Sequence, residues 1–243
     1  MKMLLLIVFN LIFVSTLLAQ KKFEKDTIKT SQGDLEITFI GHATLMFAYA
    51  GKIVHVDPVG READYSKLPQ ADLILVTHEH GDHYDPIAIK QLSHHNTTLV
   101  VTDICVRQGA KGLVMKNGET KTVAGLEITA VPAYNILHKR DNGQPFHPKG
   151  VGNGYVITFG GKKVYIAGDT ENIPEMAKLK NMAVAFLPMN LPYTMTPKMV
   201  AEAAKMFKPK ILYPYHFGQT KTDELVALLK ENPEIVVRVR RMP

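Results

Sequence analysis

The sequence predicts an α/β protein in which two β-sheets pack face to face and helices cover their outer sides. Two successions of strand-like apolar runs with interleaved helical patterns indicate this layout. The 243 residues are enough for one well-packed core. No linker, repeat or low-complexity segment separates the two halves, so we expect a single folded domain.

The first half begins with strands. Residues 34–40 alternate apolar and polar side chains as a half-buried strand does, and residues 44–50 and 52–56 predict a hairpin around Ala50-Gly51. The apolar run 71–77 predicts a buried strand, and Asp85-Pro86 predicts the start of a helix that ends near Leu92. Further strands are expected at 98–102, 113–115, 120–123 and 126–131, with a helix at 103–110.

The second half begins after a long loop, residues 132–154, that is rich in Gly and Pro. Loops of this length usually carry function. Beyond it, strands are expected at 155–159, 163–167, 184–187, 211–213 and 235–239. Helices are expected after Pro174 and over residues 197–207 and 222–229.

The N-terminus has the pattern of an export signal. Lys2 precedes an apolar run that reaches residue 18 with a break at Asn10, and Leu17-Leu18-Ala19-Gln20 resembles a signal-peptidase site. We therefore expect a signal peptide over residues 1–19, a polar mature tail over 20–33 and the folded domain over 34–243. A retained transmembrane anchor is the alternative, and the short run disfavours it. The expected location is the periplasm or the medium, with no stable membrane anchor after cleavage.

Composition limits the other function classes. The net charge of +6 is spread along the chain, and no basic stretch is interleaved with aromatic residues, so nucleic-acid binding is disfavoured. The single Cys105 rules out an intramolecular disulfide and a CxxC metal site. No GxSxG motif is present, which disfavours covalent serine catalysis. No glycine-rich phosphate loop of the Walker or dinucleotide type is present either. The oligomeric state is left open.

The stretch from Thr77 to Asp85 holds three histidines and several carboxylates directly after a buried strand. His78 and His80 are two residues apart, so both can point to one side of an extended segment. Asp82 and His83 follow the turn at Gly81 and can reach a second centre nearby. Imidazoles combined with a hard carboxylate suit zinc, manganese or iron.

This HxHxDH pattern after an apolar strand resembles the metallo-β-lactamase-fold hydrolases. The resemblance covers nearly all of the chain after residue 19 and implies an αββα four-layer sandwich with two metal ions. It implies that His78 and His80 bind one metal, and that Asp82 and His83 bind the other. Gly41-His42 at the end of the first strand is similar to a subgroup of ascorbate-phosphate lactonases and phospholipase D-like zinc hydrolases.

Two further motifs match the same family. Gly168-Asp169-Thr170 follows an apolar strand and corresponds to the family's GDT motif, which implies that Asp169 bridges the metals. His216 follows the strand at 211–213 and matches the last ligand of the second metal. His42 and Asp57 are expected to line or brace the site without binding metal, and Asp57 could equally be a plain strand-terminating turn residue.

The chain departs from the family at the third histidine of the first metal. Many relatives have Pro-Ala-x-His there, whereas this chain has Pro-Ala-Tyr134-Asn135. His138 and His147 in the following loop are the possible replacements. We expect His147, because flanking prolines restrict its neighbours and the cations beside His138 disfavour metal binding. The alternative is that His78, His80, Asp169 and water hold this metal without it.

The resemblance implies a hydrolase that uses a metal-bound hydroxide at two divalent ions, first of all Zn²⁺, with Mn²⁺ or Fe²⁺ also compatible. Asp82 and His83 are the expected catalytic residues, with Asp82 as proton shuttle. The expected substrate is a small molecule. Lys139, Arg140 and Lys149 could bind an anionic group on it, although loop cations are more often simply solvated. Pocket residues are expected to be Tyr134, Asn135, Asn190 and Tyr193.

The bond that is cleaved stays open among lactone, ester and phosphodiester. A non-catalytic member that binds metal or ligand is the first alternative, since the expected third histidine is missing. Hydrolysis of β-lactams and iron redox chemistry are further alternatives, although redox members usually carry an additional domain that is absent here.

Overall fold

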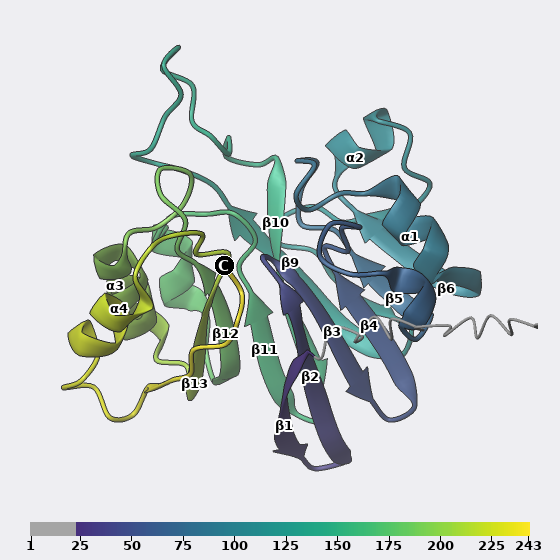
Figure 1. Cartoon of the computed structure of the whole chain (residues 1–243), viewed down its shortest axis with the longest axis horizontal. Helices are drawn as coiled ribbons and strands as arrows, with labels where there is room; N and C mark the ends of the chain where they lie inside the picture. The colour runs from purple at the N-terminus through teal and green to yellow at the C-terminus, as the bar shows by residue number, and fades with distance from the viewer. Residues whose placement is uncertain (1–22) are drawn as a thin grey trace, which may run out of the picture.

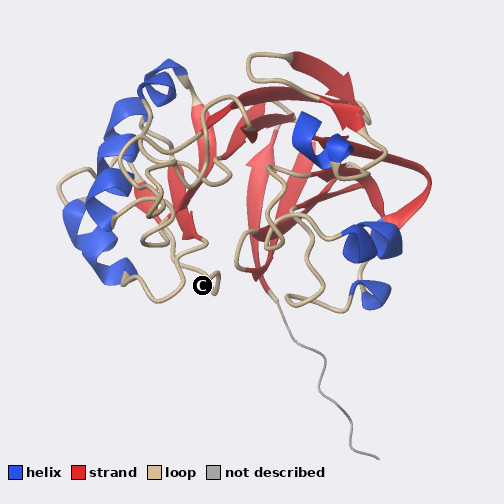
Figure 2. Cartoon of the chain, turned by 90° about the horizontal axis from the view of Figure 1, so that it is seen from above, coloured by secondary structure: helices blue, strands red, loops and turns tan. Residues whose placement is uncertain are grey.

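A computed structural model describes residues 23–243 as two seven-stranded mixed sheets packed face to face (Figures 1 and 2). Helices α1 and α2 pack on the outer side of the first sheet, and η2, α3 and α4 pack on the outer side of the second. The predicted αββα sandwich is confirmed. The predicted signal peptide, residues 1–19, lies outside the described residues.

The first sheet has the order β1-β2-β3-β4-β5-β6-β7. Its strands are β1 (Glu24–Thr30), β2 (Gly33–Gly41), β3 (Thr44–Tyr49), β4 (Lys52–Val56), β5 (Ala71–Leu75), β6 (Ser93–Val101) and β7 (Leu113–Val114). The connections contain η1 (Tyr65–Lys67), α1 (Pro86–Leu92) and α2 (Asp103–Arg107). Asp85 caps α1 as predicted, because its carboxylate accepts the backbone N–H groups of Ile87 and Ala88.

The second sheet has the order β14-β13-β12-β11-β10-β9-β8. Its strands are β8 (Thr120–Val123), β9 (Leu126–Ala133), β10 (Gly152–Phe159), β11 (Lys162–Ile166), β12 (Met182–Pro188), β13 (Ile211–Tyr215) and β14 (Val236–Val237). The helices are η2 (Pro174–Lys178), α3 (Pro197–Phe207) and α4 (Thr222–Leu228).

Alternate residues of both sheets form the central core. Phe47 of β3 stacks on Phe159 of β10 with ring centroids 5.6 Å apart, so the two inner faces are in direct contact. The opposite faces of the strands pack against the helices in two separate apolar clusters. This rigid framework holds the strand ends from which the polar loops emerge.

The prediction of a polar tail over residues 20–33 is wrong for its described part, because residues 24–30 form strand β1. β1 pairs antiparallel with β2 along its full length, with Asp26 opposite Ile37. The Asp26 carboxylate accepts hydrogen bonds from Arg240 at 2.8 Å and from the Tyr213 hydroxyl. β1 is thus an edge strand, and its polar residue Asp26 connects it by hydrogen bonds to Arg240 in the C-terminal segment. None of the helices in residues 23–243 has the length and apolarity that a membrane span requires.

Candidate metal centre

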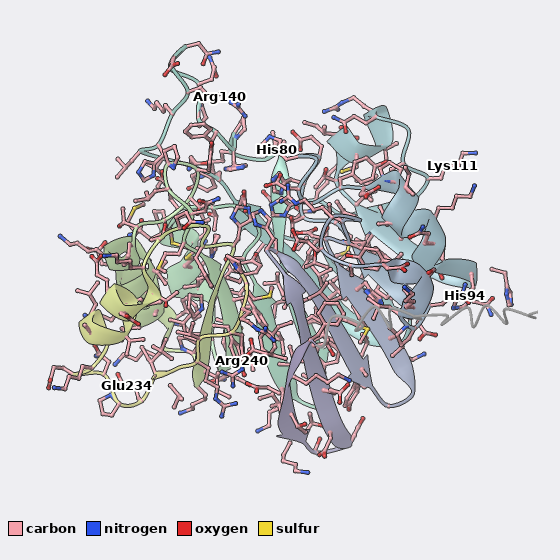
Figure 3. The ribbon with its side chains drawn as sticks, in the orientation of Figure 1. His80, His94, Lys111, Arg140, Glu234 and Arg240 are labelled. Atoms are coloured by element: carbon pink, nitrogen blue, oxygen red, sulfur yellow. The ribbon has the colours of Figure 1, made fainter. Side chains whose placement is uncertain are left out.

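A cluster of histidines and carboxylates lies where several strands end at one edge of the two sheets (Figure 3). His78 and His80 follow β5, Asp169 follows β11 and His216 follows β13. The adjacent pairs β4–β5, β11–β12 and β12–β13 are parallel, so their carboxyl ends meet at the same edge. His147 reaches the cluster from the loop at residues 134–151.

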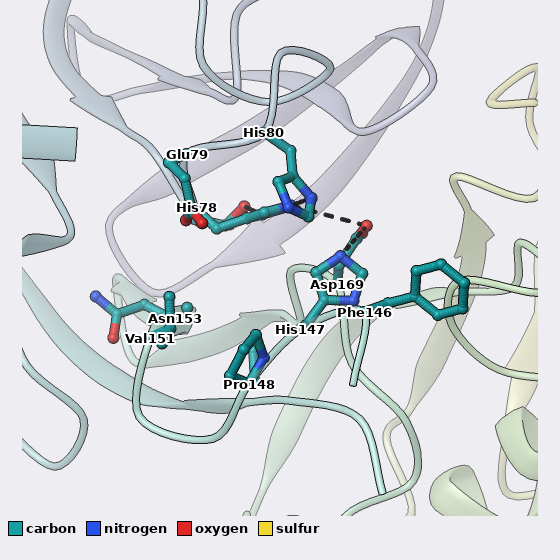
Figure 4. A pocket seen from close by; sticks show the side chains of 12 residues that line it. His78, Glu79, His80, Phe146, His147, Pro148, Val151, Asn153 and Asp169 are labelled. Carbon is teal, nitrogen blue, oxygen red and sulfur yellow. Dashed lines mark hydrogen bonds and ion pairs between the residues drawn. The ribbon is translucent and has the colours of Figure 1, made fainter. Parts of the chain in front are cut away.

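The first group of ligand atoms comes from His78, His80 and His147 (Figure 4). Nε2 of His78 lies 3.1 Å from Nδ1 of His80. Asp169 closes this group, because its Oδ2 lies 3.2 Å from Nε2 of His147 and 3.9 Å from Nε2 of His78. The structure therefore brings His147 into the position that the family pattern leaves without a histidine, whereas Nδ1 of His138 lies beside Glu171 instead.

The second group contains Asp82, His83, His216 and His42. Nε2 of His216 lies 3.4 Å from Oδ2 of Asp82 and 3.6 Å from Oδ2 of Asp169. Nε2 of His83 lies 3.4 Å from the other oxygen of Asp169. His42, which we expected only to brace the site, lies within the group, with its Nε2 3.1 Å from Oδ2 of Asp82. Asp169 is thus shared by both groups.

Orphaned polar atoms show that these residues suit a bound cation. Nε2 of His83, Nε2 of His216 and Oδ1 of Asp169 are buried without a hydrogen-bond partner. Buried polar atoms without partners are rare in folded proteins, and a metal ion between them would satisfy all three. Burial lowers the pKa of His78 well below its ordinary value, which keeps the imidazole in the neutral form that binds metals.

The charge of Asp169 is retained although the side chain is buried. Burial by itself would raise the pKa of this carboxyl, but His216, His83 and His147 around it hold the pKa well below its ordinary value. Asp82 behaves alike: burial opposes ionisation, while hydrogen bonds with His216 and His42 lower its pKa. Two ionised carboxylates therefore face the cluster of imidazoles.

Comparison with known proteins agrees with this arrangement. The model of the family described as "Beta-lactamase superfamily domain" matches residues 36–216. The chain belongs to this superfamily. A protein from Pelotomaculum thermopropionicum, named UPF0173 metal-dependent hydrolase, is 34% identical over 194 residues, which cover 76% of this chain and 85% of that protein. The present chain is accordingly an enzyme of the metallo-hydrolase class.

Two solved structures are similar to this chain over most of their length. A protein from Parabacteroides distasonis, provisionally named a metal-dependent hydrolase, is 50% identical with a TM-score of 0.87, and the match covers 91% of this chain and all of that one (100%). Igni18, a metallo hydrolase from Ignicoccus hospitalis, is 25% identical with a TM-score of 0.69, and the match covers 84% of this chain and 94% of that one.

A buried carboxylate orients one histidine of each group in this superfamily member. Asp57 is fully buried and accepts hydrogen bonds from Nδ1 of His83 at 2.8 Å and from the Thr77 hydroxyl at 2.7 Å. The Thr77 oxygen in turn lies 3.0 Å from Nδ1 of His78. Both imidazoles are thereby turned so that Nε2 faces Asp169, the arrangement that fixes the tautomer of metal-binding histidines. Asp57, which directly follows β4, thus braces the site through its hydrogen bonds with His83 and Thr77.

The backbone around the metal centre is also unusual. His42, Asp57 and His216 adopt positive φ angles of 53°, 46° and 48°, a region that residues other than glycine seldom occupy. Gly168 has φ +65°, and a Cβ there would lie 2.7 Å from the backbone oxygen of Asn153. Such conformations cluster at functional sites because the surrounding structure holds them in place.

The sequence reasoning missed Glu171, which organises the loop that carries His147. This buried carboxylate accepts the backbone N–H groups of Ile136, Leu137 and His138 at 2.6–2.8 Å and the amide of Asn135 at 3.1 Å. Oδ1 of Asn135 then lies 2.6 Å from Nδ1 of His147 and accepts its backbone N–H at 2.9 Å. The available signal in the sequence was a second carboxylate two residues after Asp169.

A cleft of about 400 Å³ opens over the cluster. Asn190 and Tyr193 line it as predicted, together with Arg140 and Phe146. The Arg140 guanidinium lies 5.3 Å from the Phe146 ring centroid, and the Phe146 ring meets Tyr193 edge-on at 5.1 Å. Tyr134 does not line this cleft: its hydroxyl donates to Glu175 at 2.9 Å and accepts from Lys149 at 3.2 Å. Asn135 supports His147 from behind, as described above.

Proposed function

We propose that the chain is a hydrolase with a dinuclear divalent-metal centre, Zn²⁺ first of all, that cleaves a lactone, ester or phosphodiester bond. The observation that supports it is the sharing of Asp169 between two groups of imidazole and carboxylate ligands. We assign His78, His80 and His147 to one metal and Asp82, His83 and His216 to the other, with Asp169 between them. Metal ions held there would supply a nucleophile at neutral pH and polarise the scissile bond.

The side chains around the centre have separate roles in this proposal. The Asp82 side chain is 32% exposed and lines the cleft, so it can accept the proton that the reaction releases. His83 is fully buried, and its two nitrogens face Asp57 and Asp169, so we assign it to holding the centre and not to proton transfer. His42 keeps Asp82 in place through a 3.1 Å contact.

The substrate in this proposal carries a negative charge. Arg140 lines the cleft, and within residues 23–243 its guanidinium pairs with no carboxylate and bonds only the Phe146 carbonyl, at 3.3 Å. Arg140 therefore retains donors for a carboxylate or phosphate group beside the bond that is cleaved. The rings of Phe146 and Tyr193 add an apolar wall.

Elemental analysis combined with a chromogenic panel tests the function. Purified protein is expected to hold about two metal ions per chain and to hydrolyse at least one phosphodiester, lactone or ester with EDTA-sensitive turnover. Asp169→Asn is expected to lose both metals and all activity while the far-ultraviolet circular dichroism is retained. A protein that shows no bound metal and no turnover, even after zinc or manganese is added back, would favour the non-catalytic alternative. Turnover of β-lactams alone would favour the alternative of β-lactam hydrolysis.

The anionic preference is tested by Arg140→Gln. For the best anionic substrate, KM should rise about tenfold, in line with the loss of one charged contact, while kcat changes little. Lys139→Gln is the matched control, because this neighbouring exposed cation does not line the cleft. Equal KM values for the two variants would refute the assignment.

Export forms part of the same proposal, on the basis of the apolar run and Ala19-Gln20 alone. N-terminal sequencing of the protein produced in a bacterial host should give Gln20 as the first residue and recover the protein outside the cytoplasm. Recovery of intact Met1 in the cytoplasm would refute this part and leave the hydrolase assignment untouched.

A further inference from the structure

A second cavity lies on the outer face of the second sheet and shares no lining residue with the cleft or with the pocket of Figure 4. Its volume is about 450 Å³, and we call it the outer pocket. The floor consists of Thr129, Val156 and Tyr165, which are neighbours across β9, β10 and β11 in the register of the sheet. This size falls within the range of small-molecule sites, roughly 300–1,000 Å³.

One wall of the outer pocket is apolar. It comes from η2 and the residues that follow, through the side chains of Ile173, Met176, Leu179 and Met182. Methionine side chains adapt to ligands of different shape. The opposite side is made by the turn at Asn117-Gly118. The interior therefore suits a flexible hydrocarbon body.

The rim of the outer pocket is positively charged. Lys163, Lys178 and Lys180 line it, all three are exposed, and none has a carboxylate within 4.0 Å among residues 23–243. The acidic residue at the rim, Glu175, is already neutralised by Lys149, whose Nζ lies 2.8 Å away. An apolar interior beneath three unpaired ammonium groups is complementary to an amphipathic anion.

We propose that the outer pocket binds a medium-chain carboxylate, with its carboxylate at the lysine rim and its alkyl chain between the sheet and η2. Binding at this place is separate from the metal centre. It adds a ligand site to the enzyme and does not rest on the hydrolase proposal.

Fluorescence titration with 11-(dansylamino)undecanoic acid tests the site. The protein is kept in EDTA, so that the carboxylate cannot bind to metal ions. We expect saturable enhancement that decanoate reverses and that decanol reverses at least tenfold less well. Absence of saturable binding, or equal competition by decanol, would overturn the proposal.

Charge-reversal variants locate the binding site. Lys163→Glu/Lys180→Glu should raise the Kd at least tenfold, whereas Lys198→Glu/Lys205→Glu on α3, with the same change of charge, should leave it unchanged. Thr129→Trp provides a second test that does not change the charge. The Trp side chain fills the floor of the outer pocket and should abolish binding. Equal affinity of both double variants, or full binding by Thr129→Trp, would place the probe elsewhere and overturn the assignment.

Discussion

The Asp57 carboxylate lies 2.8 Å from Nδ1 of His83, and neither side chain is exposed to solvent. Oδ1 of Asp57 also accepts the backbone N–H of Thr77 at 2.7 Å, and Oδ2 accepts the Thr77 hydroxyl. One carboxylate therefore receives three donors and, directly or through Thr77, fixes a histidine in each ligand group.

Replacing Asp57 and Thr77 separates these two effects. Asp57→Asn leaves one acceptor oxygen for three donors, so affinity at both metal positions should fall about 10- to 100-fold. Thr77→Val removes the link to His78 and one of the three donors to Asp57, while the direct bond between Asp57 and His83 remains. The metal position with His78 should therefore weaken much more than the position with His83. Competition titration with a chromogenic chelator measures both. Asp72→Asn is the control, because Asp72 accepts the Ile53 backbone N–H away from the centre. A uniform loss in Thr77→Val would contradict the relay.

The loop that carries His147 should depend on Glu171. Glu171→Ala leaves the backbone N–H groups of residues 136–138 without their shared acceptor and should release Asn135 and His147 together. We expect one of two metals to be lost at equilibrium, while the position with His83 and His216 stays occupied. His147→Ala should give the same stoichiometry. Glu127→Gln, an exposed carboxylate, serves as control. If Glu171→Ala and His147→Ala each still bind two metals, His147 is not a metal ligand and has only a structural role.

Gly168→Ala tests how tightly the chain is packed beside Asp169. Its Cβ would meet the Asn153 oxygen at 2.7 Å, whereas Gly161, with φ +78°, has open space around it. Gly161→Ala should therefore cost only the left-handed penalty of about 1 kcal/mol in unfolding free energy. Gly168→Ala should cost about 2 kcal/mol more, because the backbone must move. Urea unfolding in EDTA compares the stabilities of the two variants. Equal midpoints would show that the backbone at Gly168 can move to accommodate a Cβ at no extra cost.

His55 should make the fold sensitive to acid. Burial lowers its pKa from 6.5 to about 4, against the opposing effect of the Pro69 carbonyl at 3.1 Å. The unfolded chain takes up a proton near pH 6.5 and the folded one only near pH 4. Unfolding free energy should thus be constant above pH 6.5 and fall as the pH drops towards 4, by about 3 kcal/mol in total from this residue.

His55→Gln removes this titration, so its unfolding free energy should vary less between pH 6.5 and 4 than that of the native chain. His95→Gln, at an exposed histidine, should keep the native slope. All samples contain EDTA, because protonation of the metal-binding histidines would otherwise release metal in the same range. A native slope in His55→Gln would show that this imidazole is already accessible to protons.

Local patterns in the sequence predicted much of the framework. The alternation at residues 34–40, the turn at Ala50-Gly51 and the Asp85-Pro86 cap act over a few residues, and β2, the β3–β4 hairpin and α1 agree with them. The same reasoning failed for residues 24–30, because the mostly polar side chains of this segment predicted a tail and not a strand. β1 is stabilised by pairing with β2 and by Asp26, and those partners are distant in the sequence.

The sequence by itself determined the fold class, the family resemblance and the short-range histidine motif, because His78 to His83 are held within one strand-end turn. Only the tertiary structure decided that His147 and not His138 enters the cluster. The buried Glu171 carboxylate accepts the side-chain amide of Asn135, and Asn135 Oδ1 in turn accepts hydrogen bonds from His147. The tertiary structure also placed His42 beside Asp82 and removed Tyr134 from the cleft. Ligand positions supplied by loops depend on long-range contacts, and no periodic pattern in the sequence encodes them.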